Sequence, residues 1–303
     1  MQRQTSSLTS LVSTFTKAYH MNEDEPLIFK DTFANKLLLC EEYEKIAHSM
    51  IENASFFHPD IAKKQHYNPK TILQWIAHTQ LCPTPLARAA FAEKIVLNEI
   101  MLGAEQYVIL GAGLDTFALR HKYPNIRIFE VDHPATQSFK ITRFEQLGIA
   151  VPTNVTFIAS DFKVDDVRAQ LIAAGFNPHK KTVFSLLGVT YYLTETALRH
   201  LLMALFQTLP QGSSIVFDVA DEHLHTTAGI HNRVQHMVQM AAAAGEPMTF
   251  STSMQRLEQL LADVHLCVYE QLSPEAIQQQ YFAHRHDDLQ AFETIHYVHA
   301  VKY

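Results

Sequence analysis

The chain has 303 residues, of which 47% are hydrophobic and 18% are charged, a balance typical of a globular protein with a sizeable core. Its formal net charge of −7 and the lack of a Lys/Arg-rich run argue against a nucleic-acid partner. Three scattered cysteines without a CxxC motif exclude a disulfide framework, and eighteen histidines without an HxxxH or HExxH pair give no reason to expect a metal.

The N-terminus, MQRQTSSLTSLVSTF, lacks the basic start, apolar run and small-residue cleavage site of a signal peptide. No apolar run in the chain reaches the roughly 18 residues that cross a bilayer. The sequence therefore predicts a cytoplasmic protein with no membrane partner.

The first 104 residues have a helical pattern, with apolar residues at three- and four-residue spacing. Asp31 resembles a helix N-cap, Asn68 with Pro69 resembles an N-cap followed by proline in the first turn, and Gly103 suits a helix end. The spacing predicts helices over 8–20, 31–54, 69–81 and 85–102. We expect residues 1–104 to form an N-terminal helical cap.

From residue 105 onward, short apolar runs alternate with helical stretches. Apolar runs rich in β-branched and aromatic residues are typical of strands buried on both faces, and their alternation with helices indicates βαβ units. The expected strands are 107–110, 127–131, 155–159, 182–187 and 214–219. The expected helices between them are 114–122, 134–147, 165–174 and 194–208. This part of the chain predicts an α/β fold with a mostly parallel sheet.

The regular alternation of strands and helices changes after the fifth expected strand. Residues 222–263 have a helical pattern rich in Met, His and Ala, and two more strands are expected around 264–270 and 294–302, with helices near 274–290 between them. We therefore expect residues 105–303 to form one Rossmann-like domain. Its helical insertion, at about 222–263, is long enough to cover the open end of the sheet as a substrate lid.

A glycine-rich turn follows the first strand. Gly111 and Gly113 lie between a buried strand and a helix, where a missing Cβ lets the backbone approach a ligand closely. The third glycine of the dinucleotide-binding pattern is replaced by Thr116, which weakens an NAD interpretation and leaves a nucleoside-type ligand open.

Acidic residues follow the next two strands. Asp132 can accept the hydroxyl groups of a ribose, or else cap the helix that begins at Pro134. Asp161 can accept the exocyclic amine of adenine while Phe162 packs on the ring, although Asp161 could also be an N-cap. Because ligands bind at the carboxyl edge of open α/β sheets, these residues predict one shared crevice.

Three segments together resemble the leucine carboxyl methyltransferase family, including bacterial relatives of the polyketide O-methyltransferase type. They are Gly-Ala-Gly-Leu-Asp-Thr (111–116), Glu-Val-Asp-His-Pro-Ala-Thr-Gln (130–137) and Leu-Gly-Val-Thr-Tyr-Tyr-Leu (187–193). The resemblance extends from about residue 8 to 220. It implies a class I S-adenosylmethionine (SAM) methyltransferase fold, with a mostly parallel seven-stranded sheet, helices on both faces, an N-terminal helical extension contributing to the cofactor site and a helical insertion after the fifth strand.

The resemblance also implies roles for the strand-end residues. Gly111 and Gly113 would lie against the methionine part of SAM, and Asp132 would hold the ribose. Asp161 and Phe162 would lie at the adenine. The cofactor would be SAM, with S-adenosylhomocysteine (SAH) as the product.

Two further positions match basic residues of the family, and two depart from its pattern. Arg88 stands where the family places an arginine on the SAM carboxylate, and Lys17 matches a basic position in the N-terminal helix. Leu187 lies beside the cofactor where the family often has Glu, which removes one polar anchor. Phe117 replaces an Arg common in the bacterial branch.

The implied reaction is methyl transfer to a carboxylate or hydroxyl of a small-molecule or peptide-like acceptor. A carboxylate acceptor is ionised near neutral pH and needs no general base, whereas an alcohol or phenol does. Weak candidates for a base are His133, Asp221 and His223. Tyr191 and Tyr192 follow the fourth strand and could orient the acceptor at the floor of the pocket.

Two other functions stay open from the sequence. An NAD-dependent oxidoreductase could use a similar sheet, and the departures at Leu187 and Phe117 leave room for a SAM-binding protein without catalysis. The pattern identifies neither the acceptor nor the oligomeric state.

Overall fold

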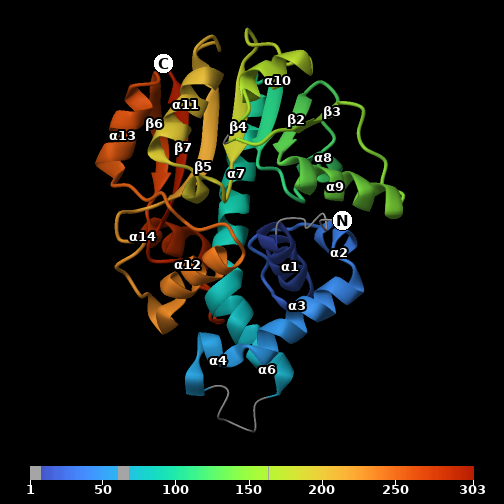
Figure 1. The fold of residues 1–303 in the computed structure, drawn as a ribbon, viewed down its shortest axis with the longest axis vertical. Helices are drawn as coiled ribbons and strands as arrows, with labels where there is room; N and C mark the ends of the chain where they lie inside the picture. Colours follow the sequence, from blue (N-terminus) through green and yellow to red (C-terminus); the bar gives the residue numbers. More distant parts are fainter. Residues whose placement is uncertain (1–7, 61–67, 163) are drawn as a thin grey trace.

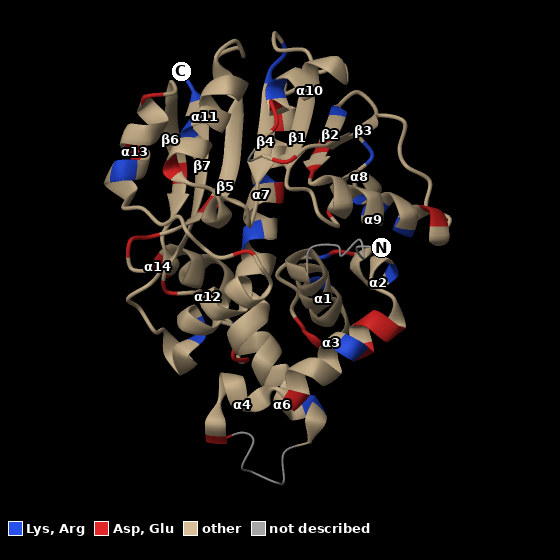
Figure 2. Cartoon of the chain, viewed as in Figure 1, with Lys and Arg blue, Asp and Glu red and all other residues tan. Residues whose placement is uncertain are grey.

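The structure is a computed structural model that describes residues 8–60, 68–162 and 164–303. A twisted sheet with flanking helices forms one half of the molecule, and a group of helices forms the other half (Figure 1). The long helix α7 (Pro83–Met101) runs through both halves. Lys, Arg, Asp and Glu residues are dispersed over both halves in this view (Figure 2).

The sheet has seven strands in the order β3-β2-β1-β4-β5-β7-β6. Strands β1 to β5 pair in parallel, and β7 pairs antiparallel with both β5 and β6. The strands are β1 (Gln106–Leu110), β2 (Arg127–Asp132), β3 (Val155–Ala159), β4 (Thr182–Leu186), β5 (Ser214–Ala220), β6 (Leu266–Leu272) and β7 (Ile295–Lys302). The predicted mostly parallel sheet and its two late strands are confirmed.

Both faces of the sheet are buried, which explains the continuous apolar runs. Along β1, Val108 and Leu110 belong to one hydrophobic core, and Tyr107 and Ile109 belong to the other. The first core is covered by α10 (Val167–Ala173), α11 (Glu195–Phe206) and α13 (Met254–Ala262). Helix α9 (Pro134–Gln146) packs beside β2 and β3, and the short helix α8 (Phe117–Arg120) follows β1.

The second core joins the sheet to the helices of the N-terminal part. Helix α7 packs against β4, β5 and β7, and its buried residues share a core with α1 and with the sheet. The other helices that the structure describes in this half are α1 (Leu8–Glu23), α2 (Ala34–Leu37), α3 (Cys40–Glu52), α4 (Ala54–Phe57), α6 (Pro69–Ile76), η1 (Ala77–Leu81), η3 (Ile230–Asn232), α12 (Arg233–Ala243), α14 (Pro274–Ile277) and η4 (Gln278–Phe282). One continuous core thus fixes the helical half against the sheet.

The predicted helix over 31–54 is wrong as a single element. It is divided into α2, α3 and α4, with Leu38 and Leu39 in extended conformation between the first two. Arg143 donates hydrogen bonds to the carbonyl oxygen of Leu37 and to the Glu42 carboxylate. This tertiary contact holds the carbonyl at the end of α2 and therefore accounts for the break that periodicity did not reveal.

Three other helices are shorter than expected. The stretch 114–122 forms only α8, because the chain first turns through the two glycines before it. The segment 222–263 contains α12 and α13, joined by a stretch without regular structure, and Ser253 caps α13. Residues 274–290 form only α14 and η4. Helix α13 packs in the core of the sheet rather than over its edge.

Two of the expected capping residues are found in their places. Asn68 accepts a hydrogen bond from the Lys70 amide at the start of α6, and Gly103 follows the end of α7 with a φ of +93°. Asp31 accepts hydrogen bonds from the Phe33 and Ala34 amides at the start of α2, although the N-cap position itself is Phe33 and not Asp31 as expected. In the described part of the chain, no helix combines the length and apolarity needed to cross a membrane.

A buried ion pair links β2 to α9 beside the glycine turn. Lys140 Nζ lies 2.5 Å from Glu130 Oε2 and 2.7 Å from the carbonyl oxygen of Asp115. Burial raises the pKa of Glu130 to about 7, although Lys140 opposes the shift. Since this pKa is above the ordinary value of 4.5, ionisation of Glu130 costs stability as pH rises through that interval.

We expect Lys140→Met to destabilise the fold by about 3 kcal/mol at about pH 8, because it leaves a buried carboxylate without its cation. The loss should be much smaller at about pH 5, where Glu130 is protonated in the folded state. Urea unfolding at both pH values measures this, and Glu130→Gln combined with Lys140→Met serves as the control. A loss independent of pH would contradict the assignment.

Candidate functional site

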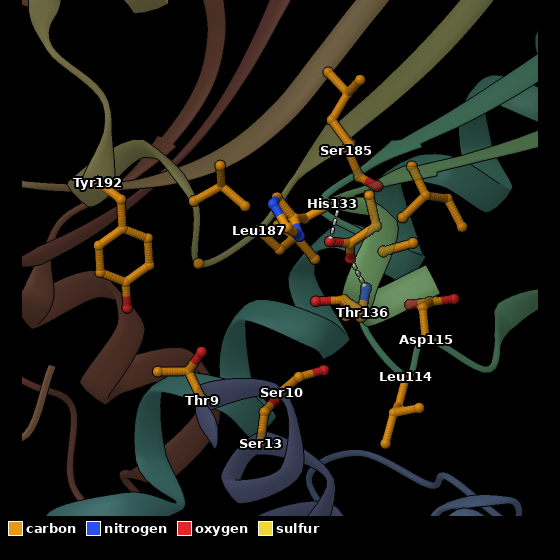
Figure 3. Close-up of a pocket in the computed structure, with 18 of the residues that line it drawn as sticks. Thr9, Ser10, Ser13, Leu114, Asp115, His133, Thr136, Ser185, Leu187 and Tyr192 are labelled. Carbon is orange, nitrogen blue, oxygen red and sulfur yellow. Dashed lines mark hydrogen bonds between the residues drawn. The ribbon is translucent and has the colours of Figure 1, made fainter. Parts of the chain in front are cut away.

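A cavity of about 1000 Å³ lies between the carboxyl edge of the sheet and the helical half. It is lined by α1, α7, the segments that follow β1 to β4, and residues 245–247 and 249. In Figure 3, side chains from α1 face those from the sheet edge across this space. The crevice expected from the strand ends is therefore present.

The turn after β1 forms one wall of the cavity. Gly111 has a φ of +74° and Gly113 a φ of +50°, a region that side chains disfavour. A Cβ at Gly111 would lie 2.4 Å from Cγ2 of Val189, and one at Gly113 would lie 2.6 Å from Oγ of Ser10. The glycines thus permit close approach of this turn to both the β4 loop and α1.

Asp132 lies at the end of β2, directly beside that turn. Its Oδ2 accepts a hydrogen bond from the Gly113 amide at 2.5 Å, and its Oδ1 accepts one from the His133 amide at 2.6 Å. Burial raises the pKa of Asp132, and these two amides offset only part of that effect. A carboxylate has about four acceptor positions, so the two amides leave capacity for the hydroxyl groups of a ligand.

The end of β3 supplies the next lining residues. Ser160, Asp161 and Phe162 all line the cavity, as expected for the latter two. The Ser160 side chain is buried, and its Oγ has no hydrogen-bond partner among the described residues. An unpaired buried hydroxyl on the cavity wall is a site for a polar ligand atom.

Arg88 lies on α7, lines the cavity and is held in place by a buried carboxylate. Its Nη1 donates to Asp218 Oδ2 at 3.0 Å, and Asp218, on β5, is fully buried. The same carboxylate accepts hydrogen bonds from the Gly188 amide and the Tyr191 hydroxyl, both at 2.6 Å. Burial alone would lower the pKa of Arg88, but the charge of Asp218 raises it overall. Arg88 is thus a permanent, oriented cation on the cavity wall.

Lys17 also lines the cavity, on α1, but it has a protein partner. Its Nζ lies 3.4 Å from Oδ2 of the buried Asp31 and 5.4 Å from the centre of the Phe29 ring. Arg120 lies near the same ring and pairs with Glu93 at 2.5 Å. This end of the cavity is therefore a neutralised cluster of ion pairs.

The weak catalytic candidates are not brought together. Tyr192 and the exposed His133 line the cavity, but they follow β4 and β2, which are separated by β1. Tyr191 is buried and donates to Asp218, so it orients Arg88 and does not form the pocket floor as expected. Neither His223 nor Asp221 is among the residues that line the cavity. Asp221 accepts a hydrogen bond from the His223 amide and faces His296.

The two residues that depart from the family pattern lie in different parts of the structure. Leu187 lines the cavity after β4 and packs against the second core. Phe117 is buried at the start of α8, with its ring 4.9 Å from that of Tyr107. Leu187 thus gives the cavity wall an apolar surface, and Phe117 stabilises the helix that follows the glycine turn.

Sequence reasoning missed three polar residues of the site. Asp218 gave one signal, because a charged residue inside an apolar strand run must be paired when it is buried. Thr9 and Glu246 gave none: their hydrogen bond of 2.6 Å joins α1 to the segment after α12 across 237 positions of the chain. In the ranges that the structure describes, no three His, Cys, Asp or Glu side chains form a group suited to a metal ion.

Comparison with known proteins identifies a matching family model and a relative that matches the whole chain. The leucine carboxyl methyltransferase family model matches residues 10–206. The protein YktD of Bacillus subtilis, by its name an S-adenosyl-L-methionine-dependent methyltransferase, is 49% identical over the full length of both chains. A protein of Mycobacterium avium with the same kind of name is 34% identical over 48% of this chain and 46% of its own.

Solved structures share the fold at low sequence identity. A DUF574 family protein from Streptomyces avermitilis has a TM-score of 0.55 at 12% identity, over 96% of this chain and 97% of its own. A structure described as a methyltransferase from Thermobifida fusca has a TM-score of 0.53 at 13% identity, over 99% and 96%. These similarities support the fold assignment.

We expect Gly111→Ala to destabilise the protein more than Gly148→Ala. Both glycines have positive φ, but a Cβ at Gly148 meets nothing within 4 Å, whereas one at Gly111 meets the branched Val189 side chain at 2.4 Å. The control should lose about 1 kcal/mol, and Gly111→Ala about 1–3 kcal/mol more. Urea unfolding measures both, and equal losses would contradict the close approach at this turn.

Proposed function

The chain belongs to the leucine carboxyl methyltransferase family and is a SAM-dependent methyltransferase; we propose that it methylates an oxygen atom, a carboxylate or a hydroxyl, of a small-molecule or peptide-like acceptor. The observation that carries the cofactor assignment is the convergence of residues from four strand ends on one cavity. The oxygen acceptor is inferred from the family resemblance.

The adenosine part fits the β2 and β3 side of the cavity. Asp132 would accept the ribose hydroxyls, and Asp161 would accept the adenine amine while Phe162 packs on the ring. The unpaired hydroxyl of Ser160 adds a donor at the same wall. This set of acceptors and one aromatic ring fits a nucleoside.

The methionine part fits the β1 and β4 side. The turn at Gly111 and Gly113 would lie against it, and Arg88 would bind its carboxylate. Asp218 fixes the guanidinium in place before binding, which reduces the entropy lost on association. Leu187 would contribute an apolar contact, and Lys17 a weaker electrostatic one because it already faces Asp31.

SAM supplies an electrophilic methyl group on a sulfonium. The protein's part is to hold an acceptor oxygen in line with that methyl, and such positioning can supply on the order of 7–11 kcal/mol. We propose that residues 1–104 act as a cap and residues 105–303 as the cofactor domain. Of the insertion at about 222–263, the part around 245–249 lines the cavity and would act as the substrate lid, whereas α13 packs in the core of the sheet.

An NAD-dependent oxidoreductase fits this site less well. The position of the third glycine is held by Thr116, which is buried and accepts a hydrogen bond from Arg120 Nε at 2.8 Å. A packed side chain there fills space that the dinucleotide pattern leaves to glycine. A SAM-binding protein without catalysis is the other alternative, and an acceptor screen separates it from the proposed enzyme.

We expect SAH to stabilise the protein against heat, with a Tm that rises with SAH concentration, because a ligand that binds only the folded state shifts unfolding by mass action. NAD at equal concentration should leave Tm unchanged. A thermal-shift titration with both ligands measures this, and stabilisation by NAD alone would reject the cofactor assignment.

We expect Asp132→Ala and Arg88→Lys each to weaken SAH binding about tenfold or more, since each removes charge-assisted hydrogen bonds worth about 1.5–3 kcal/mol. Asp263→Ala is the matched control, because Asp263 is an exposed carboxylate at the end of α13 that pairs with Arg199 and does not line the cavity. Calorimetric titration with SAH measures the affinities, and an unchanged Kd in either variant would remove that residue from the cofactor site.

A further inference from the structure

A second cavity lies in the helical half of the molecule. Its volume is about 430 Å³, and its lining comes from the segment after α4, from α6 and η1, and from the segment after η4. Helices α4 and α6 form the end of this half that is farthest from the sheet (Figure 1). Among the described residues, the two cavities share no lining residue. The second cavity is therefore separate from the proposed cofactor site, and a ligand there does not depend on the proposed function.

His78, on η1, lines this cavity and is held by a carboxylate that directly follows α1. Its side chain is 2% exposed, and its Nε2 lies 2.8 Å from Oδ1 of the equally buried Asp24. The other oxygen of Asp24 lies 2.6 Å from Nδ1 of His20, whose Nε2 accepts the Ile28 amide at 2.7 Å. Burial alone would raise the pKa of Asp24, but the hydrogen bonds with the two imidazoles lower it to about 2. Asp24 is therefore an ionised acceptor, and each histidine donates to it.

This arrangement leaves one ring nitrogen of His78 available. Because Nε2 carries the proton that Asp24 accepts, Nδ1 of the neutral ring is an acceptor. Both nitrogens of His20 have a hydrogen-bond partner, whereas Nδ1 of His78 has none among the described residues. Buried polar atoms are as a rule hydrogen-bonded. A ligand that reaches His78 from the cavity can satisfy Nδ1 only with an N–H or O–H donor.

The rest of the lining carries negative charge and one large aromatic ring. Asp288 is exposed and forms no side-chain ion pair or hydrogen bond within the described chain, whereas the neighbouring Asp287 pairs with Arg285 at 2.5 Å. The described lining contains neither lysine nor arginine. Trp75 is half-buried, and its ring lies edge-on to that of His58 with 5.5 Å between the centres. An indole face and an unpaired carboxylate both attract a cation.

We propose that this second cavity binds an organic ammonium ion that carries at least one N–H. Nδ1 of His78 accepts the N–H, Asp288 provides the opposite charge, and Trp75 packs against the alkyl part. A quaternary ammonium would suit Trp75 and Asp288 but would leave Nδ1 without a donor. A neutral alcohol could donate to Nδ1 but would gain no attraction from Asp288, and a carboxylate would meet a like charge.

Four probes with one cyclohexyl skeleton test this selectivity at about pH 8 and constant ionic strength. They are cyclohexylammonium, N,N,N-trimethylcyclohexylammonium, cyclohexanol and cyclohexanecarboxylate. Trp75 is the only tryptophan of the chain, so its fluorescence reports binding at this cavity. We expect a saturable change with cyclohexylammonium, a weaker affinity for the trimethyl compound and no binding of the other two. Equal affinity for the trimethyl compound would overturn the role of His78. No saturable change with cyclohexylammonium, or equal or tighter binding of the alcohol or the carboxylate, would overturn the proposal.

We expect Asp288→Asn, which keeps the shape of the side chain and removes its charge, to weaken cyclohexylammonium binding about fivefold, the effect of a partly exposed ion pair. Asp263→Asn is the matched control, because Asp263 is an exposed carboxylate at the end of α13 that does not line this cavity. Its affinity should equal that of the unchanged protein. An unchanged Kd in Asp288→Asn, or equal losses in both variants, would overturn the proposal.

His78→Phe keeps an aromatic ring but removes the acceptor nitrogen. We expect this variant to bind cyclohexylammonium and the trimethyl compound with equal affinity, whereas a merely structural role of His78 would leave the preference for the N–H cation in place. Because the substitution also leaves Asp24 with one imidazole partner, Tm is measured first. If the variant does not fold, the selectivity of the unchanged protein and the comparison of Asp288→Asn with Asp263→Asn decide.

Discussion

The arrangement of the site depends on the buried carboxylate of Asp218. An ionised group inside a sheet is stable only when it is paired and fully hydrogen-bonded, and Asp218 meets this condition with Arg88, the Gly188 amide and the Tyr191 hydroxyl. These three partners come from α7 and from the segment after β4. The one carboxylate, on β5, therefore holds α7, the segment after β4 and β5 itself in a single geometry.

The same requirement explains why a helix of the N-terminal half takes part in a strand-end site. The carboxyl edge of the parallel strands supplies glycines, Asp132 and Asp161, which suit a ribose and an adenine but provide no cation. Arg88 adds a cation to the cavity wall, and α7 is held against β4, β5 and β7 by apolar packing as well as by the ion pair. The proposed role of Arg88 would therefore couple cofactor recognition to the attachment of the cap to the sheet.

The sequence predicted the sheet and the gathering of the strand-end residues at one cavity, because those features have local signals. Strands buried on both faces are continuous apolar runs, and Asp132 and Asp161 follow directly from the ends of β2 and β3. The break at Leu38 and the place of Tyr191 were not predictable, since they depend on Arg143 and Asp218 far along the chain. The assignments of individual residues to parts of the cofactor stay predictions.

Local and distant sequence signals also distinguish the two sides of the proposed site, the side that binds the methyl donor and the side that binds the acceptor. The proposed cofactor contacts lie at positions whose register is fixed by strand pairing, so a change of backbone there would disturb the sheet. The residues around Glu246 lie on a segment without regular structure, tied to α1 through Thr9. Such a segment can change sequence at little cost to the core. In the proposed function, the methyl donor therefore binds where the fold constrains the chain most, and this segment of the cavity wall is where the fold constrains it least.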